Sequence, residues 1–263
     1  MLALIAGQGA LPKVLAEAVD ERPLIAALAR FPPATLVPDI TFRIETLGSF
    51  LQDLTARGVT GVCFAGALRR HPIEPAEIDA ATMPLVPRMA EALQQGDDAA
   101  LSTVLAFFEE AGFSVKAAHE VLPDLLPPPG HLTEAPPTDS DRADVARAAD
   151  VLAALSGADV GQGCVVHRRQ VLAVEGAVGT DWMLASLEHR PDDGTGGTFY
   201  KAPKAGQDRR IDLPVIGPET VHAAADAGLY GIAVEAEGVM VLDRATTVAL
   251  AEKLGVYLWV RES

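Results

Sequence analysis

The first half of the chain alternates short apolar runs with amphipathic stretches. Three stretches repeat apolar residues at the spacing of a helix: residues 11–19, 47–57 and 99–111. Four apolar runs have the length of buried strands: Leu2–Ala6, Leu24–Leu28, 59–65 and 113–117. Strands that alternate with helices predict a Rossmann-like parallel sheet covered by helices.

The second half has a different order of elements. Residues 162–174 read as a hairpin that turns near Arg168 and Arg169, and residues 231–234 and 239–242 read as a second hairpin. Residues 256–260 predict a closing strand. Helical spacing occurs in four stretches: 142–155, 180–189, 219–227 and 245–254. We therefore expect a mixed α/β domain.

A proline-rich segment separates the two halves. Six of the 19 prolines lie between residues 123 and 137. Proline lacks the N–H that a helix or a central strand needs, so this segment predicts an extended, semi-stiff connector. We expect a Rossmann-like domain over residues 1–122, a linker over 123–140, and a catalytic α/β domain over 141–263.

Composition excludes several classes of protein. Apolar residues make up 49% of the 263 residues, which predicts folded cores. The net charge of −15 argues against nucleic acid as a partner. Uncharged apolar runs fall short of the ~18–20 residues that cross a bilayer, and no basic region precedes the first apolar run. Cys63 and Cys164 lie in apolar runs, which predicts buried thiols in a cytoplasmic protein.

Charge is densest between residues 201 and 212. If the segment is extended, Asp208, Arg210 and Asp212 share a face; in a helical turn, Asp208 and Asp212 do. Carboxylates with cations beside them can hold Mg²⁺ and a phosphate together. The alternative is a solvated, charged loop. The charged residues are Lys201, Lys204, Asp208, Arg209, Arg210 and Asp212.

Two loops of the first half are candidates for ligand contact. Gly7 and Gly9 follow the first strand and precede a helix, where glycines let backbone N–H groups approach a phosphate. A tight strand–helix turn is the alternative, and Pro12 stands where a dinucleotide fingerprint needs its third glycine. Arg70 follows strand 59–65, at the sheet edge where α/β proteins bind ligands.

A third polar group lies at residues 175–181. Thr180 is a natural N-cap for the helix that follows, and Asp181 lies in its first turn. Capping does not explain Glu175, a carboxylate in an otherwise apolar run. The histidines lack metal-ligand spacing, and no Gly-x-Ser-x-Gly elbow occurs, so metal-assisted chemistry fits better than a covalent nucleophile.

Ten short motifs stand in one order along nearly the whole chain. They are Gly7-Gln8-Gly9-Ala10-Leu11-Pro12; Ala65-Gly66 with Arg70; Gly96-Asp97-Asp98; Asp159-Val160-Gly161-Gln162; Leu172-Ala173-Val174-Glu175-Gly176; Gly179-Thr180-Asp181; Lys201-Ala202-Pro203-Lys204 with Gly206-Gln207-Asp208; Arg210 with Asp212-Leu213-Pro214; Ile216-Gly217; and Gly228-Leu229 with Gly231-Ile232-Ala233-Val234-Glu235-Ala236. In these motifs the sequence resembles the LpxI family of UDP-2,3-diacylglucosamine pyrophosphatases, enzymes of lipid A biosynthesis.

The resemblance implies a function. We expect Mg²⁺-dependent hydrolysis of the diphosphate of UDP-2,3-diacylglucosamine to UMP and 2,3-diacylglucosamine 1-phosphate (lipid X). It also implies a glycolipid held between two domains, a homodimer, and a cytoplasmic protein peripherally bound to the inner membrane. The rival hypotheses are a non-catalytic carrier of nucleotide-sugar lipids and a hydrolase of soluble nucleotide sugars.

The expected site residues fall into three groups. The catalytic group is Lys204, Asp208, Arg210 and Asp212. The metal group is Asp181, Asp208 and Asp212. The substrate-binding group is Gly7, Gly9, Arg70, Gln162, Thr180, Lys201, Gln207 and Thr220.

Overall fold

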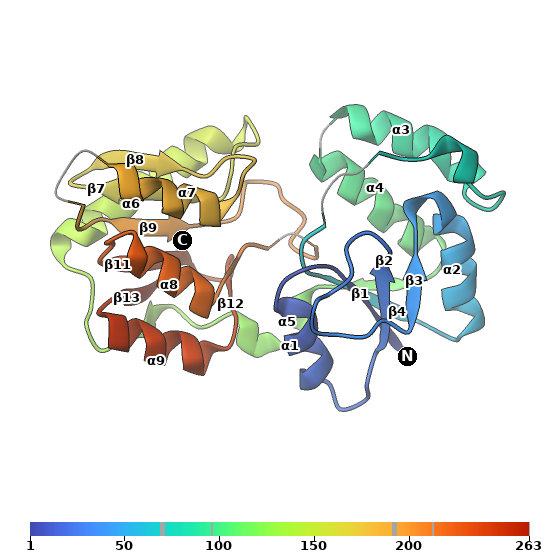
Figure 1. Ribbon diagram of the computed structural model, residues 1–263, viewed down its shortest axis with the longest axis horizontal. Coiled ribbons are helices and arrows are strands. Elements are labelled where there is room, and N and C mark those ends of the chain that lie inside the picture. The colour runs from blue at the N-terminus through green and yellow to red at the C-terminus, as the bar shows by residue number, and fades with distance from the viewer. Residues whose placement is uncertain (69–71, 96, 191–193, 212, 263) are drawn as a thin grey trace. The chain divides into compact units, whose positions relative to one another are not determined.

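The protein consists of two compact units (Figure 1). The computed structural model describes residues 1–68, 72–95, 97–190, 194–211 and 213–262. Unit 1 contains Met1–Pro123 and Asp208–Asp212, and unit 2 contains Asp124–Gln207 and Leu213–Ser263. The segment between residues 201 and 212 is therefore divided between the two units.

Unit 1 is built on a parallel sheet in the strand order β3-β2-β1-β4-β5. Chain order reverses between β1 and β4, the position at which open α/β sheets bind ligands. The strands are β1 (Leu2–Ala6), β2 (Leu24–Leu28), β3 (Ile40–Phe42), β4 (Gly61–Ala65) and β5 (Ser114–Lys116). The predicted parallel sheet is confirmed, with β3 as an additional strand.

Aromatic side chains join this sheet to its helices. Phe50 of α2 stacks on Phe42 of β3, with 3.9 Å between ring centroids, and Phe108 of α4 meets Phe64 of β4 edge-on at 5.1 Å. Such contacts bury large apolar surfaces, and the preference of aromatic rings for stacked or edge-on arrangements also fixes how the helices lie on the sheet. The helices of unit 1 are α1 (Leu11–Ala18), α2 (Leu47–Ala56), α3 (Val86–Gln95), α4 (Asp97–Glu110) and α5 (Ala118–Val121).

Unit 2 contains a mixed sheet in the order β6-β13-β11-β9-β7-β8. Its central strands β9, β11 and β13 are parallel, whereas β6, β7 and β8 run antiparallel to their neighbours. The strands are β6 (Gly130–His131), β7 (Gly163–His167), β8 (Gln170–Val174), β9 (Thr198–Lys201), β11 (Gly231–Glu235) and β13 (Tyr257–Arg261). Strands β10 (Val215–Ile216) and β12 (Met240–Val241) form a separate parallel pair. The predicted mixed domain is confirmed.

Helices cover both faces of the mixed sheet. Alternate residues along a strand point to opposite faces, so Phe199 joins the core under α7, α8 and α9, while its neighbour Tyr200 packs with α6. The helices are α6 (Asp139–Ser156), α7 (Thr180–Ser186), α8 (Pro218–Asp226) and α9 (Arg244–Leu254). Short 3-10 turns also occur, at Ile44–Thr46, Pro75–Glu77, Met83–Leu85, Pro123–Leu125 and Leu187–His189.

One predicted hairpin of unit 2 is confirmed and the other is wrong. β7 and β8 pair through a turn in which Arg168 and Arg169 both have positive φ, at 49° and 64°. In contrast, residues 231–234 and 239–242 do not pair with each other. Both edges of β11 are occupied, by β9 and β13, so β12 pairs with β10 instead.

The proline-rich segment contributes structure of its own. Residues 130–131 form β6, which adds antiparallel to β13 at the edge of the mixed sheet. Helix α6 begins at Asp139 because Thr138 caps it, and the Thr138 Oγ1 accepts from the Asp141 N–H. The segment is therefore only in part the extended connector expected from its composition.

Candidate functional site

A buried lysine ends the parallel strand β9 of unit 2. Lys201 is only 6% exposed. Its Nζ donates to Thr180 Oγ1 at 2.5 Å, and that hydroxyl donates to Glu175 Oε1 at 2.8 Å. Glu175 Oε2 lies 3.8 Å from the same Nζ. Burial lowers the pKa of Lys201, while the negative charges of Glu175 and Asp181 oppose this effect. The fold thus brings together the predicted residues Lys201 and Thr180.

Two glycines make the space in which Glu175 lies. A Cβ at Gly161 would come within 1.9 Å of the Glu175 carbonyl oxygen, and a Cβ at Gly163 within 2.7 Å of Glu175 Oε2. The backbone N–H of Glu175 donates to the Gly163 carbonyl at 2.8 Å. The Gln162 N–H approaches Oε2 at 3.4 Å. Gly161 is therefore required by the backbone of Glu175, and Gly163 by its carboxylate together with the Phe199 ring.

The first part of the charged segment is anchored within unit 2. Gln162 Nε2 donates to Gln207 Oε1 at 2.7 Å, and the backbone N–H of Lys204 donates to the same oxygen at 3.1 Å. Lys204 Nζ forms an ion pair with Asp159, and only 15% of its side chain is exposed. Three predicted residues, Gln162, Gln207 and Lys204, therefore belong to one polar network.

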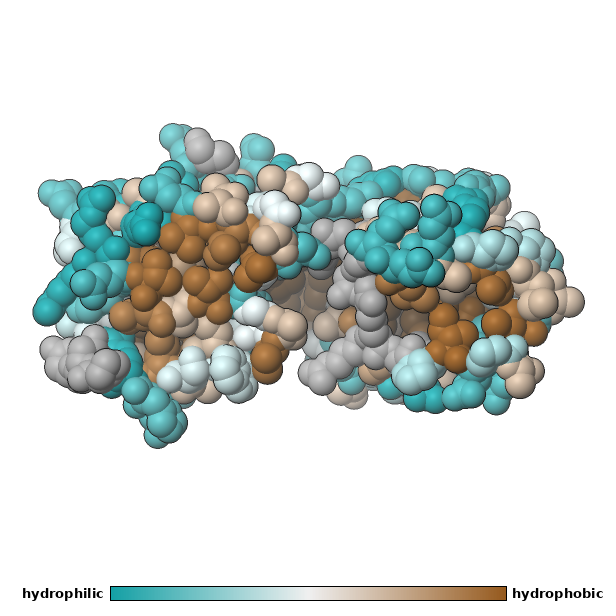
Figure 2. All heavy atoms as spheres, turned by 90° about the horizontal axis from the view of Figure 1, so that it is seen from above, coloured by the Kyte–Doolittle hydropathy of each residue, from teal (hydrophilic) through white to brown (hydrophobic). Residues whose placement is uncertain are grey.

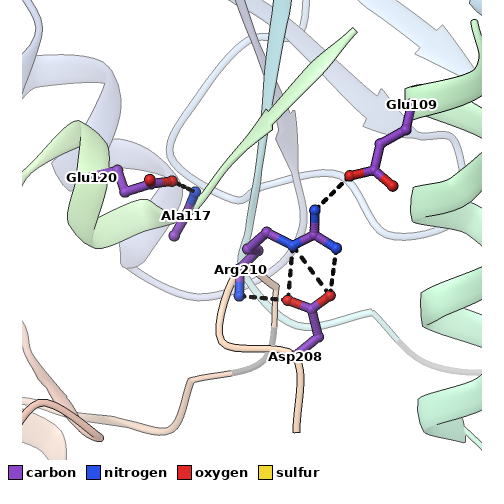
Figure 3. Close-up of polar contacts among 5 residues, drawn as sticks. All are labelled: Glu109, Ala117, Glu120, Asp208 and Arg210. Carbon is purple, nitrogen blue, oxygen red and sulfur yellow. Dashed lines mark hydrogen bonds and ion pairs between the residues drawn. The ribbon is translucent and has the colours of Figure 1, made fainter. Parts of the chain in front are cut away.

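The second part of the charged segment belongs to unit 1 and forms a turn (Figure 3). Arg210 holds the Asp208 carboxylate through Nη2 at 2.7 Å, Nε at 3.0 Å and its backbone N–H at 3.0 Å. Arg210 Nη1 also donates to Glu109 Oε1 of α4 at 2.5 Å. These hydrogen bonds lower the pKa of Asp208 and raise that of Arg210. Residues 208–211 thus adopt neither an extended strand nor a helical turn, because Asp208 closes onto Arg210.

The two glycine loops of unit 1 meet at the reversal of strand order. Gln8 and Ala67 exchange backbone hydrogen bonds at 2.9 Å, and the Gly7 N–H donates to the Ala65 carbonyl at 2.7 Å. A Cβ at Gly7 would lie 2.7 Å from the Ala67 oxygen. Gly9 has a φ of 97°, which glycine adopts without strain. The loop pairing gives Gly7 a structural reason, and contact of Gly7 and Gly9 with a phosphate stays a prediction.

Thr220 and Asp181 lie in the first turns of two helices of unit 2. Thr220 Oγ1 of α8 accepts from the Gly217 N–H at 3.3 Å, so it completes the start of its own helix. Asp181 is exposed on α7. The predicted residues Arg70 and Asp212 lie outside the described residues.

Both cysteines are buried, as the sequence predicts. Burial raises the pKa of Cys63 to about 12 and that of Cys164 to about 11. The thiolate is the reactive form of cysteine, so neither side chain is suited to act as a nucleophile.

The expected Mg²⁺ can be compared with the carboxylates that the structure describes. Among these residues there is no group of three or more His, Cys, Asp or Glu that could hold a metal. Both oxygens of Asp208 accept hydrogen bonds from Arg210.

The fold and the site define an α/β protein of two units, the second of which contains the buried lysine Lys201. Two family models, described as the LpxI N-terminal and LpxI C-terminal domains, match residues 1–125 and 128–259. The chain belongs to the LpxI family, which confirms the resemblance. It is 39% identical over 268 aligned residues to a Caulobacter vibrioides protein named UDP-2,3-diacylglucosamine pyrophosphatase LpxI, with 98% of this chain and 96% of that protein covered.

Three charged residues of these networks were not among the predicted site residues: Glu109, Asp159 and Glu175. Glu175 had a signal, since it is the one carboxylate in the apolar run 171–178. Glu109 had none, because an exposed glutamate near the end of a helix is common in any soluble fold. Its contact with Arg210 becomes visible only in the folded chain.

The part of the chain that the structure describes contains no helix long and apolar enough to cross a membrane.

Proposed function

We propose that the protein is a hydrolase that cleaves the diphosphate of UDP-2,3-diacylglucosamine in lipid A biosynthesis. One observation carries this proposal. Both LpxI domains match along the chain, and the Caulobacter relative that aligns with 98% of it is named for this activity.

The proposed reaction is a displacement at phosphorus. Water attacks the β-phosphorus, and the bond from this phosphorus to the bridging oxygen breaks. UMP leaves with the bridging oxygen, while 2,3-diacylglucosamine 1-phosphate keeps the oxygen of the water. The proton lost by the water passes to the departing phosphate or to solvent.

Cations of the charged segment would stabilise this reaction. We assign Lys201, Lys204 and Arg210 to neutralising negative charge on the phosphates. The burial of Lys201 supports its assignment, since a charge interacts more strongly where water is excluded. Asp208 and Asp212 are proposed to orient the attacking water. The remaining predicted contacts to substrate are Gly7, Gly9, Arg70, Gln162, Thr180, Gln207 and Thr220.

We also propose that hydrolysis depends on Mg²⁺. A diphosphate supplies oxygen ligands to this ion, which retains several waters and needs few ligands from the protein. The family resemblance supports the dependence.

Product analysis tests these proposals. The purified protein is incubated with UDP-2,3-diacylglucosamine in H₂¹⁸O with Mg²⁺, and in parallel with excess EDTA. We expect UMP only with Mg²⁺, and ¹⁸O in the lipid phosphate. Label in UMP would contradict attack at the β-phosphorus, and UMP formation in EDTA would contradict the dependence on metal. A protein that binds the substrate without cleaving it would be a carrier. Cleavage of UDP-glucose at a similar rate would indicate a hydrolase of soluble nucleotide sugars.

We propose peripheral binding to the cytoplasmic face of the inner membrane. Figure 2 shows apolar residues gathered on the face of unit 2 that is turned to the viewer. Val178 and Trp182, on either side of Thr180, are 67% and 62% exposed. Tryptophan favours the boundary between lipid and water. Co-sedimentation with phosphatidylethanolamine–phosphatidylglycerol vesicles tests the proposal, and equal sedimentation of the parent and Trp182→Ser would contradict a role for this side chain.

A homodimer is the last element of the proposal. The family resemblance supports it. Light scattering after gel filtration measures the mass directly, and the mass of one 27.5 kDa chain at micromolar concentration would contradict the dimer.

A further inference from the structure

The Lys201 ammonium has more donors than the described residues use. An ammonium carries three N–H groups. Among the described residues, Lys201 Nζ donates one hydrogen bond, to Thr180 Oγ1, and Glu175 Oε2 at 3.8 Å is beyond good hydrogen-bond distance. A charged group with 6% exposure and spare donors is costly unless a ligand completes its contacts.

Lys201 is connected to Glu175 through the Thr180 hydroxyl, and the two hydrogen bonds of this relay run in one direction. A hydroxyl has one proton to donate. The Thr180 proton is directed to Glu175 Oε1 at 2.8 Å, so its oxygen is left to accept from Lys201 Nζ at 2.5 Å. The carboxylate therefore sets the orientation of the hydroxyl, and the hydroxyl sets the position of the ammonium.

The position of Glu175 is itself determined by its surroundings. Gly163 leaves room for its carboxylate, Gly161 leaves room for its backbone, and its N–H is bonded to the Gly163 carbonyl. Buried ion pairs contribute little to stability on balance. Here the ion pair is long, at 3.8 Å, and the Thr180 hydroxyl bridges the two charged groups by hydrogen bonds of 2.5 and 2.8 Å.

We propose that Glu175 is a positioning residue for Lys201, acting through the Thr180 hydroxyl to direct the spare N–H groups of the ammonium toward the diphosphate of the substrate. This inference rests on the proposed function. Misplacement of a group that contacts the reacting phosphate lowers kcat more than it raises KM, because the contact is strongest in the transition state.

Three variants separate positioning from a structural role. Glu175→Gln keeps an oxygen that can accept from Thr180 but removes the charge, and we expect kcat to fall roughly 10-fold. Thr180→Val removes the hydroxyl at nearly constant volume, and we expect a fall of about 100-fold with KM within about threefold. Thr180→Ser restores the hydroxyl and should recover most of the parent kcat. Glu17→Gln, on the exposed face of α1, is the matched control and should retain the parent kcat.

A second measurement reports on Lys201 without turnover. The chain has five lysines, so protein labelled with ¹³Cε-lysine gives a simple carbon spectrum, and loss of one signal in Lys201→Arg assigns Lys201. We expect the Lys201 signal to move in Glu175→Gln and Thr180→Val. In the parent we expect it to move when UDP, the soluble diphosphate probe, is added.

The outcomes are distinct. A Lys201 signal that stays in place in both variants overturns the inference, as does a signal that moves while kcat and KM stay at parent values. Failure of Thr180→Ser to recover activity also overturns it. Absence of UMP release by the parent contradicts the proposed function instead, and the carbon spectra of the variants then decide alone whether Glu175 fixes Lys201.

Discussion

Arg210 Nη1 lies 2.5 Å from Glu109 Oε1, although 101 positions separate the two residues in the sequence. Their side chains are 37% and 46% exposed, so the pair adds at most about 1 kcal/mol to stability. Its effect is local, because the same guanidinium binds Asp208 and closes the turn. The ion pair therefore connects α4 to the turn at residues 208–211.

We expect Glu109→Gln to loosen this turn without unfolding unit 1. The ion pair is lost, so the backbone N–H groups of Arg210 and Ile211, which bond to Asp208, should exchange with deuterium several-fold faster. Hydrogen exchange with peptide-level mass spectrometry measures this. Glu110→Gln is the matched control, because the neighbouring glutamate pairs with Arg88 instead. Equal exchange in both variants would mean that Glu109 does not hold the turn.

Asp208→Ala and Asp212→Ala should each reduce hydrolysis by about 100-fold or more, the loss typical of a residue that organises the reacting groups. UMP release at saturating substrate is the measurement. Asp53→Ala, which breaks only an exposed pair with Arg57, should stay close to the parent rate. If both of the first two variants remain within a few-fold of the parent, the assignment of the aspartates is wrong.

Glu45 should make stability depend on pH in the acid range. Burial raises its pKa, but hydrogen bonds from Arg43 and the Glu74 N–H outweigh burial and lower it to about 2. A pKa below its unfolded value of about 4.5 means that the ionised form stabilises the fold above pH 4.5, and that this contribution disappears as pH falls toward 2. We expect Glu45→Gln to cost roughly 1–3 kcal/mol in urea unfolding at pH 7 and much less at pH 2.5. The exposed Glu17→Gln should show no such difference, and a constant cost for Glu45→Gln would refute the linkage.

The turn between β7 and β8 depends on Asp144 of α6. This buried carboxylate accepts from the N–H groups of Arg168 at 3.0 Å and Arg169 at 2.5 Å, both in the left-handed region. Asp144→Asn should destabilise unit 2 by about 1–3 kcal/mol. Arg169→Gly should instead leave stability equal or higher by up to about 1 kcal/mol, because glycine adopts this φ freely. Chemical denaturation of both variants tests these two predictions. A loss of stability in Arg169→Gly would show that the Arg169 side chain contributes more to stability than its positive φ costs.

Cys63 and Cys164 should be inert in the folded protein. Both are buried, and burial raises the pKa of each well above the pH of the assay. At pH 8 we expect Ellman's reagent to react slowly with native protein and rapidly with both thiols in 6 M urea. Rapid reaction of either thiol in the native state would contradict the burial.

The parallel sheet of unit 1 was predictable because its strands and helices alternate along the sequence, and each follows a local pattern. Strand β3 was not predictable, because three residues are too few to show the alternation of apolar and polar side chains that marks a strand. The prediction of a hairpin at residues 231–242 was wrong for a different reason. Two apolar runs close in sequence suggest pairing, but β11 is occupied on both edges by strands that are distant in sequence.

The candidate site was predictable to a similar extent. Motif order singled out Lys201, Thr180 and Gln162, which the fold brings into adjoining networks. The closure of Asp208 onto Arg210 was not predicted, because side-chain competition for a carboxylate has no signature in residue spacing. Glu175 stood out in the sequence, but the space for it depends on Gly161, before β7, and Gly163, the first residue of β7.

The division of the charged segment between the units has a practical consequence. Both ends of Asp208–Asp212 continue into unit 2, so the polypeptide passes from one unit to the other three times instead of once. A gene cut at the proline-rich segment would yield one fragment with Glu109 and another with Arg210. Neither half expressed alone would retain the turn, and fragment complementation would be needed to rebuild it.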